Sequence, residues 1–209
     1  MNDFSIGMAL VDYIPVAFFA VAAVILMRAL YERMSKSAYA LFSAGVIDVT
    51  VAEALKATWK LLYAAGACDF TALDAMFFPV QSIGFLLAGI GMLLLLCRPQ
   101  KAAAAVVAPT VFQGTFLFVG LMVAGLGMMD AVLCILAKKQ KKPLLIALFG
   151  LSFLCSLCMG YLSAQDFTEA AMNWIAEGVN VLGQGSFLYG VWLLFKNGAT
   201  APKTEDAAV

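Results

Sequence analysis

Four polar side chains form a stripe along the last apolar segment of the chain. Asn173, Glu177, Asn180 and Gln184 are separated by steps of four, three and four residues, which places them on one face of a helix. Amide and carboxylate groups that face lipid are very unfavourable, so this face must line the interior of a bundle or an aqueous cavity. The plain alternative is hydrogen bonding between helices. We expect Glu177 to bind a proton or an ion.

A second set of charged residues lies in an earlier apolar segment. Glu53, Lys56 and Lys60 are spaced by three and four residues and share one helical face, so an internal ion pair is available and Glu53 could neutralise Lys56. Asp48 lies deeper in the same segment. Either lysine is a candidate cation partner for Glu177, and the alternative is that both lysines extend to the membrane interface. All four residues are candidate ligand- or ion-binding groups.

An amide in a third apolar segment completes the candidate site. Gln81 follows Pro79, and a proline inside a helix frees a backbone carbonyl that ions and substrates use in transporters. The alternative is a plain proline kink. Asp12 begins the first apolar segment, where an acidic residue suits a helix N-terminus, and we expect it at the membrane boundary.

The composition limits the class of protein. Apolar residues make up 64% of the 209-residue chain and charged residues 12%, against about 45–50% and about 25% in soluble domains. Such a chain cannot cover a surface in water, which excludes a soluble globule and a disordered chain. The zero net charge and the missing basic face exclude a nucleic-acid-binding protein. Because His is absent, we expect no metal site and no cofactor.

Apolar runs of about 20 residues predict an all-α, polytopic transmembrane bundle that forms one domain over 1–196, with a disordered tail at 197–209. Six spans are expected, within the ranges 10–30, 38–64, 75–97, 102–137, 144–163 and 170–195. The fourth range is too long for one straight helix. A kinked start near Pro109 is our preferred interpretation, and a seventh span remains open.

The two halves of the chain, 1–101 and 102–196, resemble each other. An Ala-Leu-Phe tripeptide ending at Phe42 recurs ending at Phe149, and Gly91 aligns with Gly190 when Gln81 is placed against Asn180. Two consecutive repeats of three spans each must be inverted relative to one another, so we predict a 3+3 inverted repeat. An outside N-terminus and inside C-terminus, in a cell membrane, place seven basic residues inside but leave four lysines at 138–142 outside.

These features favour a small solute or ion transporter or channel. An alternative is a membrane subunit that binds a ligand, senses or scaffolds without transport, as a homodimer or with a partner membrane protein. An intramembrane enzyme, which would use thiols or paired carboxylates, is the third hypothesis. Its thiols would be Cys155 and Cys158, but this Cys-x-x-Cys lies in the middle of an apolar helix rather than at a helix N-terminus, so we expect no enzyme activity.

Overall fold

The computed structural model describes residues 5–96, 115–162 and 170–196, and within these ranges the chain is helical and has no strands. The helices are α1 (Ile6–Val11), α2 (Tyr13–Leu30), α3 (Lys36–Ala64), α4 (Thr71–Ala75), α5 (Phe77–Leu94), α6 (Thr115–Lys139), α7 (Pro143–Leu162) and α8 (Ala170–Phe195). Because α1 joins α2 and α4 joins α5, the described chain has six helices long and apolar enough to cross a membrane. The expected six-span bundle is confirmed.

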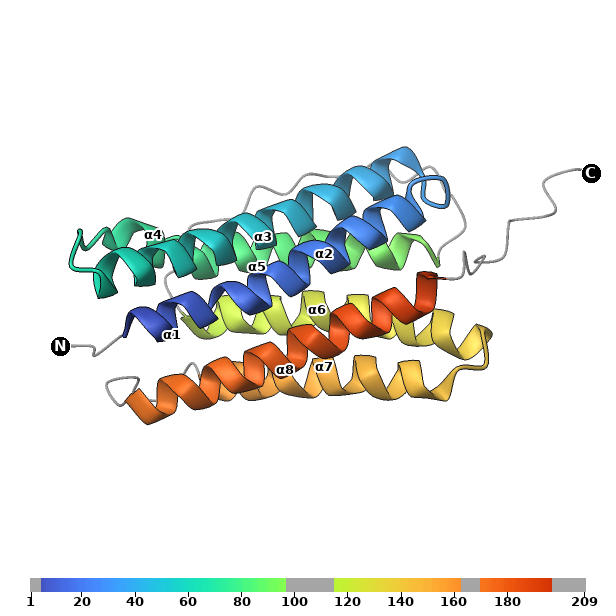
Figure 1. Cartoon of the computed structure of the whole chain (residues 1–209). Helices are drawn as coiled ribbons and strands as arrows, with labels where there is room; N and C mark the ends of the chain where they lie inside the picture. Colours follow the sequence, from blue (N-terminus) through green and yellow to red (C-terminus); the bar gives the residue numbers. More distant parts are fainter. Residues whose placement is uncertain (1–4, 97–114, 163–169, 197–209) are drawn as a thin grey trace, which may run out of the picture.

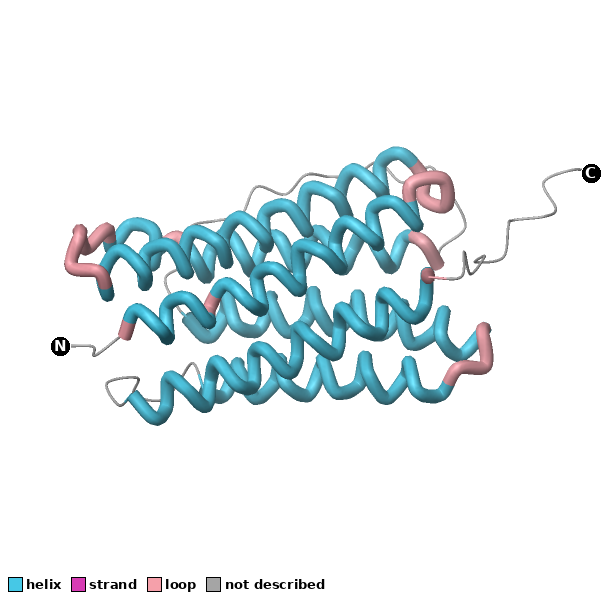
Figure 2. The backbone as a smooth tube through the Cα atoms, viewed as in Figure 1, coloured by secondary structure: helices cyan, strands magenta, loops and turns pink. Residues whose placement is uncertain are grey.

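The six spanning helices run along one common direction (Figures 1 and 2), and their contacts form a closed ring. Each contacts the next one along the chain, in the order α2, α3, α5, α6, α7 and α8, and α8 closes the ring against α2. Two of these contacts, α2 with α3 and α6 with α7, join antiparallel helices that are connected by a short turn. A ring leaves a central space that side chains of all six helices reach.

The predicted inverted orientation of the two halves is wrong. Near one end of the two helices, Asp12 and Glu177 contact the same lysine, Lys60. Farther along, Phe18 of α2 lies against Gly185 of α8. Residue numbers therefore increase in the same direction along α2 and α8, and the two helices are parallel. Figure 1 shows that α5 and α6 also run in the same direction. The first half (α1–α5) and the second half (α6–α8) therefore have the same orientation.

The helix α6 begins at the end of the bundle opposite to the one where α5 finishes (Figure 1). The inverted arrangement requires α5 and α6 to run in opposite directions, which they do not. The connecting residues 97–114 lie outside the described part, as do the preferred kinked start of the fourth span, the alternative of a seventh span and the tail 197–209.

Equivalent contacts recur in the two halves. A Cβ added to Gly91 would lie 2.8 Å from the Phe42 side chain, and one added to Gly190 would lie 2.8 Å from the Phe149 side chain. These are the residues that the sequence repeat aligns. Seven residues earlier on α5 and α8, Gly84 lies against the backbone of Gly45, while Gly183 lies against the Cys155 side chain and, farther away, the Ser152 carbonyl. The contacts of Gly91 and Gly190 therefore occupy corresponding places in the two halves.

Basic residues gather at one end of the bundle, which we call the basic end. It is formed by the turns after α2 and α6 and by the end of α8 (Figure 1). The described basic residues at or near this end are Arg28, Arg33, Lys36, Lys138, Lys139, Lys141, Lys142 and Lys196. The conflict expected between two groups of basic residues does not arise, because parallel halves place both groups together.

Aromatic side chains fill the middle of the bundle. Phe19 lies 5.6 Å from Phe85 and 6.0 Å from Phe187 between ring centroids, and Phe149 lies 6.3 Å from Phe187. These four residues, at most 2% exposed, are the phenylalanine cluster. From there to the basic end the core consists of buried aliphatic side chains such as Leu26, Leu30, Met92, Leu133 and Leu194. This part of the ring is packed closed.

Pro79 lies near the beginning of a span and not in its middle. It lies in the first turn of α5, directly after the helix break at Met76, where its missing N–H costs nothing. Ser82 donates a hydrogen bond of 3.1 Å to the Pro79 carbonyl. Pro79 therefore lies inside the third span, Thr71–Leu94, one turn after its interruption at Met76, which fits the alternative of a plain proline kink.

Candidate functional site

A cavity of about 350 Å³ lies in the half of the bundle away from the basic end, and we call it the central cavity. All six spanning helices and both halves of the chain line it. Its size falls within the range of about 300–1,000 Å³ that is typical of small-molecule sites. The phenylalanine cluster separates it from the packed core, and Phe85 belongs to both.

The central cavity brings together seven of the eight side chains selected from the sequence: Glu53, Lys56, Gln81, Asn173, Glu177, Asn180 and Gln184. The stripe on α8 therefore faces the interior. Gln81 and Asn180, which the repeat aligns, line the cavity from α5 and α8. The eighth residue, Asp48, is half-buried on α3 and is not among the lining residues. Asp48 lies five positions before Glu53, so its side chain leaves the helix about 140° away from that of Glu53.

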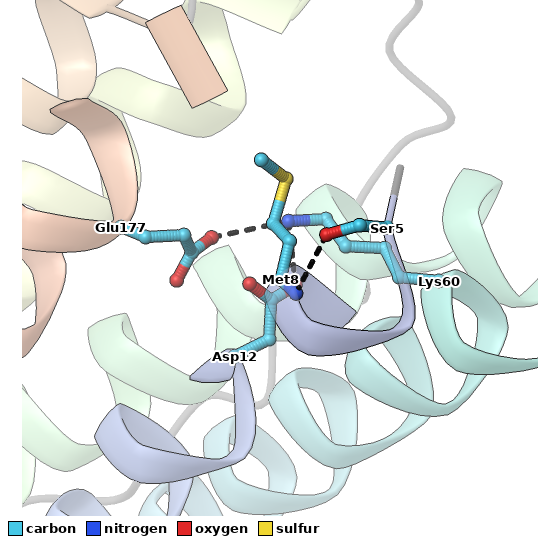
Figure 3. Close-up of polar contacts among 5 residues, drawn as sticks. All are labelled: Ser5, Met8, Asp12, Lys60 and Glu177. Carbon is cyan, nitrogen blue, oxygen red and sulfur yellow. Dashed lines mark hydrogen bonds and ion pairs between the residues drawn. The ribbon is translucent and has the colours of Figure 1, made fainter. Parts of the chain in front are cut away.

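A charged triad occupies one side of the cavity. The Lys60 ammonium lies 3.1 Å from Glu177 Oε1 and also contacts Asp12 Oδ2 (Figure 3). The three residues come from α3, from α8 and from the break between α1 and α2, and each is less than 10% exposed. Lys60 does not reach to the interface, and it is the lysine that pairs with Glu177.

The triad carries two carboxylates around one ammonium. One oxygen of each carboxylate, Asp12 Oδ1 and Glu177 Oε2, is buried without a hydrogen-bond partner. With all three groups ionised, the triad has a net charge of −1 in a site of low dielectric, where an uncompensated charge is costly. The arrangement is suited to take up one further positive charge, as a proton or as a bound cation.

A second polar group lies along the same face of α3. Gln81 Nε2 donates a hydrogen bond of 2.9 Å to Glu53 Oε1, while Glu53 Oε2 and Gln81 Oε1 are buried without partners. The Lys56 ammonium lies 3.9 Å from the centre of the Phe77 ring and forms no ion pair among the described residues. The ion pair that the spacing of Glu53 and Lys56 makes available is therefore not formed, and both signs of charge remain available to a ligand.

The sequence interpretation missed Asp12 as a member of the site. An acidic residue at the start of an apolar segment suits a helix N-terminus, and this general rule concealed its role. The signal that points inward is the run of four apolar residues from Met8 to Val11, which extends the span outward by more than a turn. Asp74 and Phe77, at the start of the third span, were not selected either.

The thiols do not form a paired site. Cys155 is buried beside the cavity while Cys158 is exposed on the outer side of α7, and both are free. Asp130 is buried on α6 with neither carboxylate oxygen hydrogen-bonded, and it does not line the cavity. Over 5–96, 115–162 and 170–196, no group of three or more Cys, Asp or Glu residues is placed to hold a metal ion.

Comparison with known proteins gives no relative. A scan against protein-family models and searches of curated proteins and of solved structures found no match. The functional argument therefore depends on the geometry and charge of the central cavity.

Proposed function

We propose that the protein is a small-solute or ion transporter and that the central cavity is its substrate site. The observation that carries this proposal is a cavity of about 350 Å³ lined by charged and amide groups from both halves and closed toward one end by the phenylalanine cluster. Transporter folds commonly hold their substrate between two structural repeats. A pathway blocked on one side is what a transporter shows in one of its two access states.

The distribution of basic residues supports an orientation. Lys and Arg in short loops accumulate on the cytoplasmic side of membrane proteins. The basic end carries all the described basic residues except Lys56 and Lys60, which line the cavity. We therefore assign the basic end to the cytoplasm of a cell, which leaves α1 and the central cavity toward the outside and the end of α8 inside.

The triad supplies a means of coupling. Asp12 and Lys60 belong to the first half and Glu177 to the second, so the contact between Lys60 and Glu177 links the halves directly. A proton or cation that binds Glu177 weakens this link, while Asp12 still compensates the charge of Lys60. The relative position of the halves then depends on the occupancy of Glu177, which is the requirement for coupled transport.

The test is flux in proteoliposomes. Purified protein is reconstituted with a pH-sensitive dye inside, and radiolabelled amino acids, amines and carboxylates are added one at a time. We expect uptake of at least one class that depends on pH or on a cation gradient. The variant Glu177→Gln should lose that dependence while it retains folding, because glutamine keeps the shape and removes the charge. The matched control is Glu32→Gln, which neutralises an exposed acid in the turn after α2.

If flux through the Glu177→Gln variant depends on pH or on a cation as it does in the wild type, Glu177 has no part in the coupling mechanism. Binding without flux for every solute would favour the alternative, a ligand-binding membrane subunit. One observation is compatible with that alternative: the packing of Phe19 between Phe85 and Phe187 leaves the cavity with no described path to the basic end.

A further inference from the structure

We propose that the central cavity binds a small zwitterion, a molecule that carries one ammonium group and one carboxylate group, as amino acids do. This inference rests on the proposed function, because it names the substrate class of the same cavity. It is argued from the second polar group, formed by Glu53, Lys56 and Gln81, and not from the triad.

The acceptor side of the site consists of Glu53 and Gln81. Glu53 Oε2 and Gln81 Oε1 are buried without hydrogen-bond partners, although the other atoms of the two groups are joined by the 2.9 Å hydrogen bond. Gln81 is only 5% exposed. Buried acceptors without donors are unfavourable, and a ligand that donates to both relieves that cost. An ammonium group has three N–H donors and the opposite charge to Glu53.

The donor side of the site is Lys56. Its ammonium lies over the ring of Phe77 and near that of Phe78, and no carboxylate of the described residues lies within 4 Å of it. The aromatic faces hold the ammonium in place without neutralising it. Such a cation, held in a cavity, is suited to bind a carboxylate.

The spacing of the two sides suits a small molecule. Glu53 and Lys56 are three residues apart on α3, which places their Cβ atoms about 5–6 Å from each other. One compact ligand can therefore contact Glu53 with its ammonium and Lys56 with its carboxylate. The two charged groups of an amino acid lie closer together than this, and a hydrogen bond at each end makes up the difference.

The balance of charge selects a zwitterion over an ion. A simple cation at Glu53 would be repelled by Lys56, and a simple anion at Lys56 would be repelled by Glu53. A zwitterion satisfies both groups and leaves the net charge of the buried site unchanged. The rings of Phe77 and Phe78 lie beside Lys56, and Met122 and Leu126 also line the cavity, so an apolar side chain of the zwitterion has apolar groups to pack against.

The test is binding to the full chain in lipid nanodiscs, measured by isothermal titration calorimetry. The main probes are leucine, isoamylamine, which lacks the carboxylate, and 4-methylpentanoate, which lacks the ammonium. Glycine and phenylalanine test the apolar contacts. We expect leucine to bind at least tenfold more tightly than either analogue and more tightly than glycine.

Two variants assign the ends of the ligand. Lys56→Gln should weaken the binding of leucine at least tenfold without weakening the binding of isoamylamine. Glu53→Gln should weaken the binding of leucine without weakening the binding of 4-methylpentanoate. The matched control Asp48→Asn neutralises an acid on the same helix outside the cavity lining and should leave every affinity unchanged. Circular dichroism and size-exclusion profiles identify any variant that fails to fold, and Lys56→Arg, which keeps the charge, then replaces Lys56→Gln and should retain leucine binding.

The outcomes separate this inference from the proposed function. An amine that binds as tightly as leucine, or no binding of any of the three amino acids, overturns the zwitterion site. Flux of some other solute in proteoliposomes would then still support transport. Leucine binding that obeys the two variants, combined with no flux of any solute, would establish the zwitterion site and overturn transport.

Discussion

Removal of the ammonium from the triad should destabilise the protein severely. In Lys60→Met, a side chain of similar length replaces the charge, and two carboxylates whose oxygens now lie within about 6 Å of each other lose their common cation. Loss of one partner from a buried ion pair costs about 3–5 kcal/mol in unfolding free energy. At about 1.4 kcal/mol per factor of ten, this corresponds to a decrease of about 10²- to 10⁴-fold in the folding equilibrium constant.

The measurement is equilibrium unfolding in mixed micelles with increasing detergent denaturant, followed by tryptophan fluorescence. A second variant completes the test: Asp12→Asn, Lys60→Met and Glu177→Gln combined remove all three charges and should recover most of the loss, because neutral replacement of a buried ion pair is nearly free of cost. The control Lys139→Met removes an exposed lysine and should change stability by about 0.5 kcal/mol or less.

Two results would refute this reasoning. If Lys60→Met alone lies within about 1 kcal/mol of the wild type, the ammonium is not an essential counter-charge. If the triple variant is as unstable as Lys60→Met, the loss comes from packing around the lysine stem and not from the two uncompensated carboxylates.

Three further predictions concern the phenylalanine cluster, the close contacts between helices and the orientation of the bundle in the membrane. Phe85→Ala should open the phenylalanine cluster and produce a passive ion leak in proteoliposomes that the wild type lacks; an unchanged permeability would show that the core below still seals the bundle. Gly45→Ala places a methyl group against the backbone of α5 and should lower the free energy of unfolding by about 1–3 kcal/mol. Gly150→Ala, where an added Cβ has no atom within 4 Å, should leave the stability unchanged or raise it by up to about 1 kcal/mol. Equal effects of the two variants would contradict the close contact at Gly45. With the other cysteines replaced by serine, a membrane-impermeant maleimide on intact cells should label the exposed Cys68 but not a cysteine introduced at Lys139; the reverse pattern would place the basic end outside.

The spans and the polar stripe were predictable from local patterns. A spanning helix needs about 20 apolar residues, and runs of that length are visible without any knowledge of packing. The spacing of Asn173, Glu177, Asn180 and Gln184 allows only one interior face at 3.6 residues per turn. This face does line the central cavity. Hydrophobic periodicity and the cost of polar groups in lipid are both properties of a single helix, so one sequence is enough to reveal them.

The partners and the orientation of the halves were not predictable in the same way. Lys60 and Glu177 are 117 positions apart, and no local rule selects Lys60 over Lys56 as the partner of that carboxylate. Glu53 binds Gln81 and not the lysine one turn away, because contacts between helices compete with those along a helix. The inverted arrangement followed from an odd number of spans, three, in each half, an assumption that depends on residues 97–114, where periodicity alone did not decide the number of spans.

The common direction of the two halves has a consequence for biogenesis. Each half brings its own cluster of cationic residues to the same end, in the turn after α2 and in the turn after α6. Each half therefore carries the same kind of orientation signal at the same end. We expect a chain cut between α5 and α6 to yield two fragments that insert into the bilayer in the same direction.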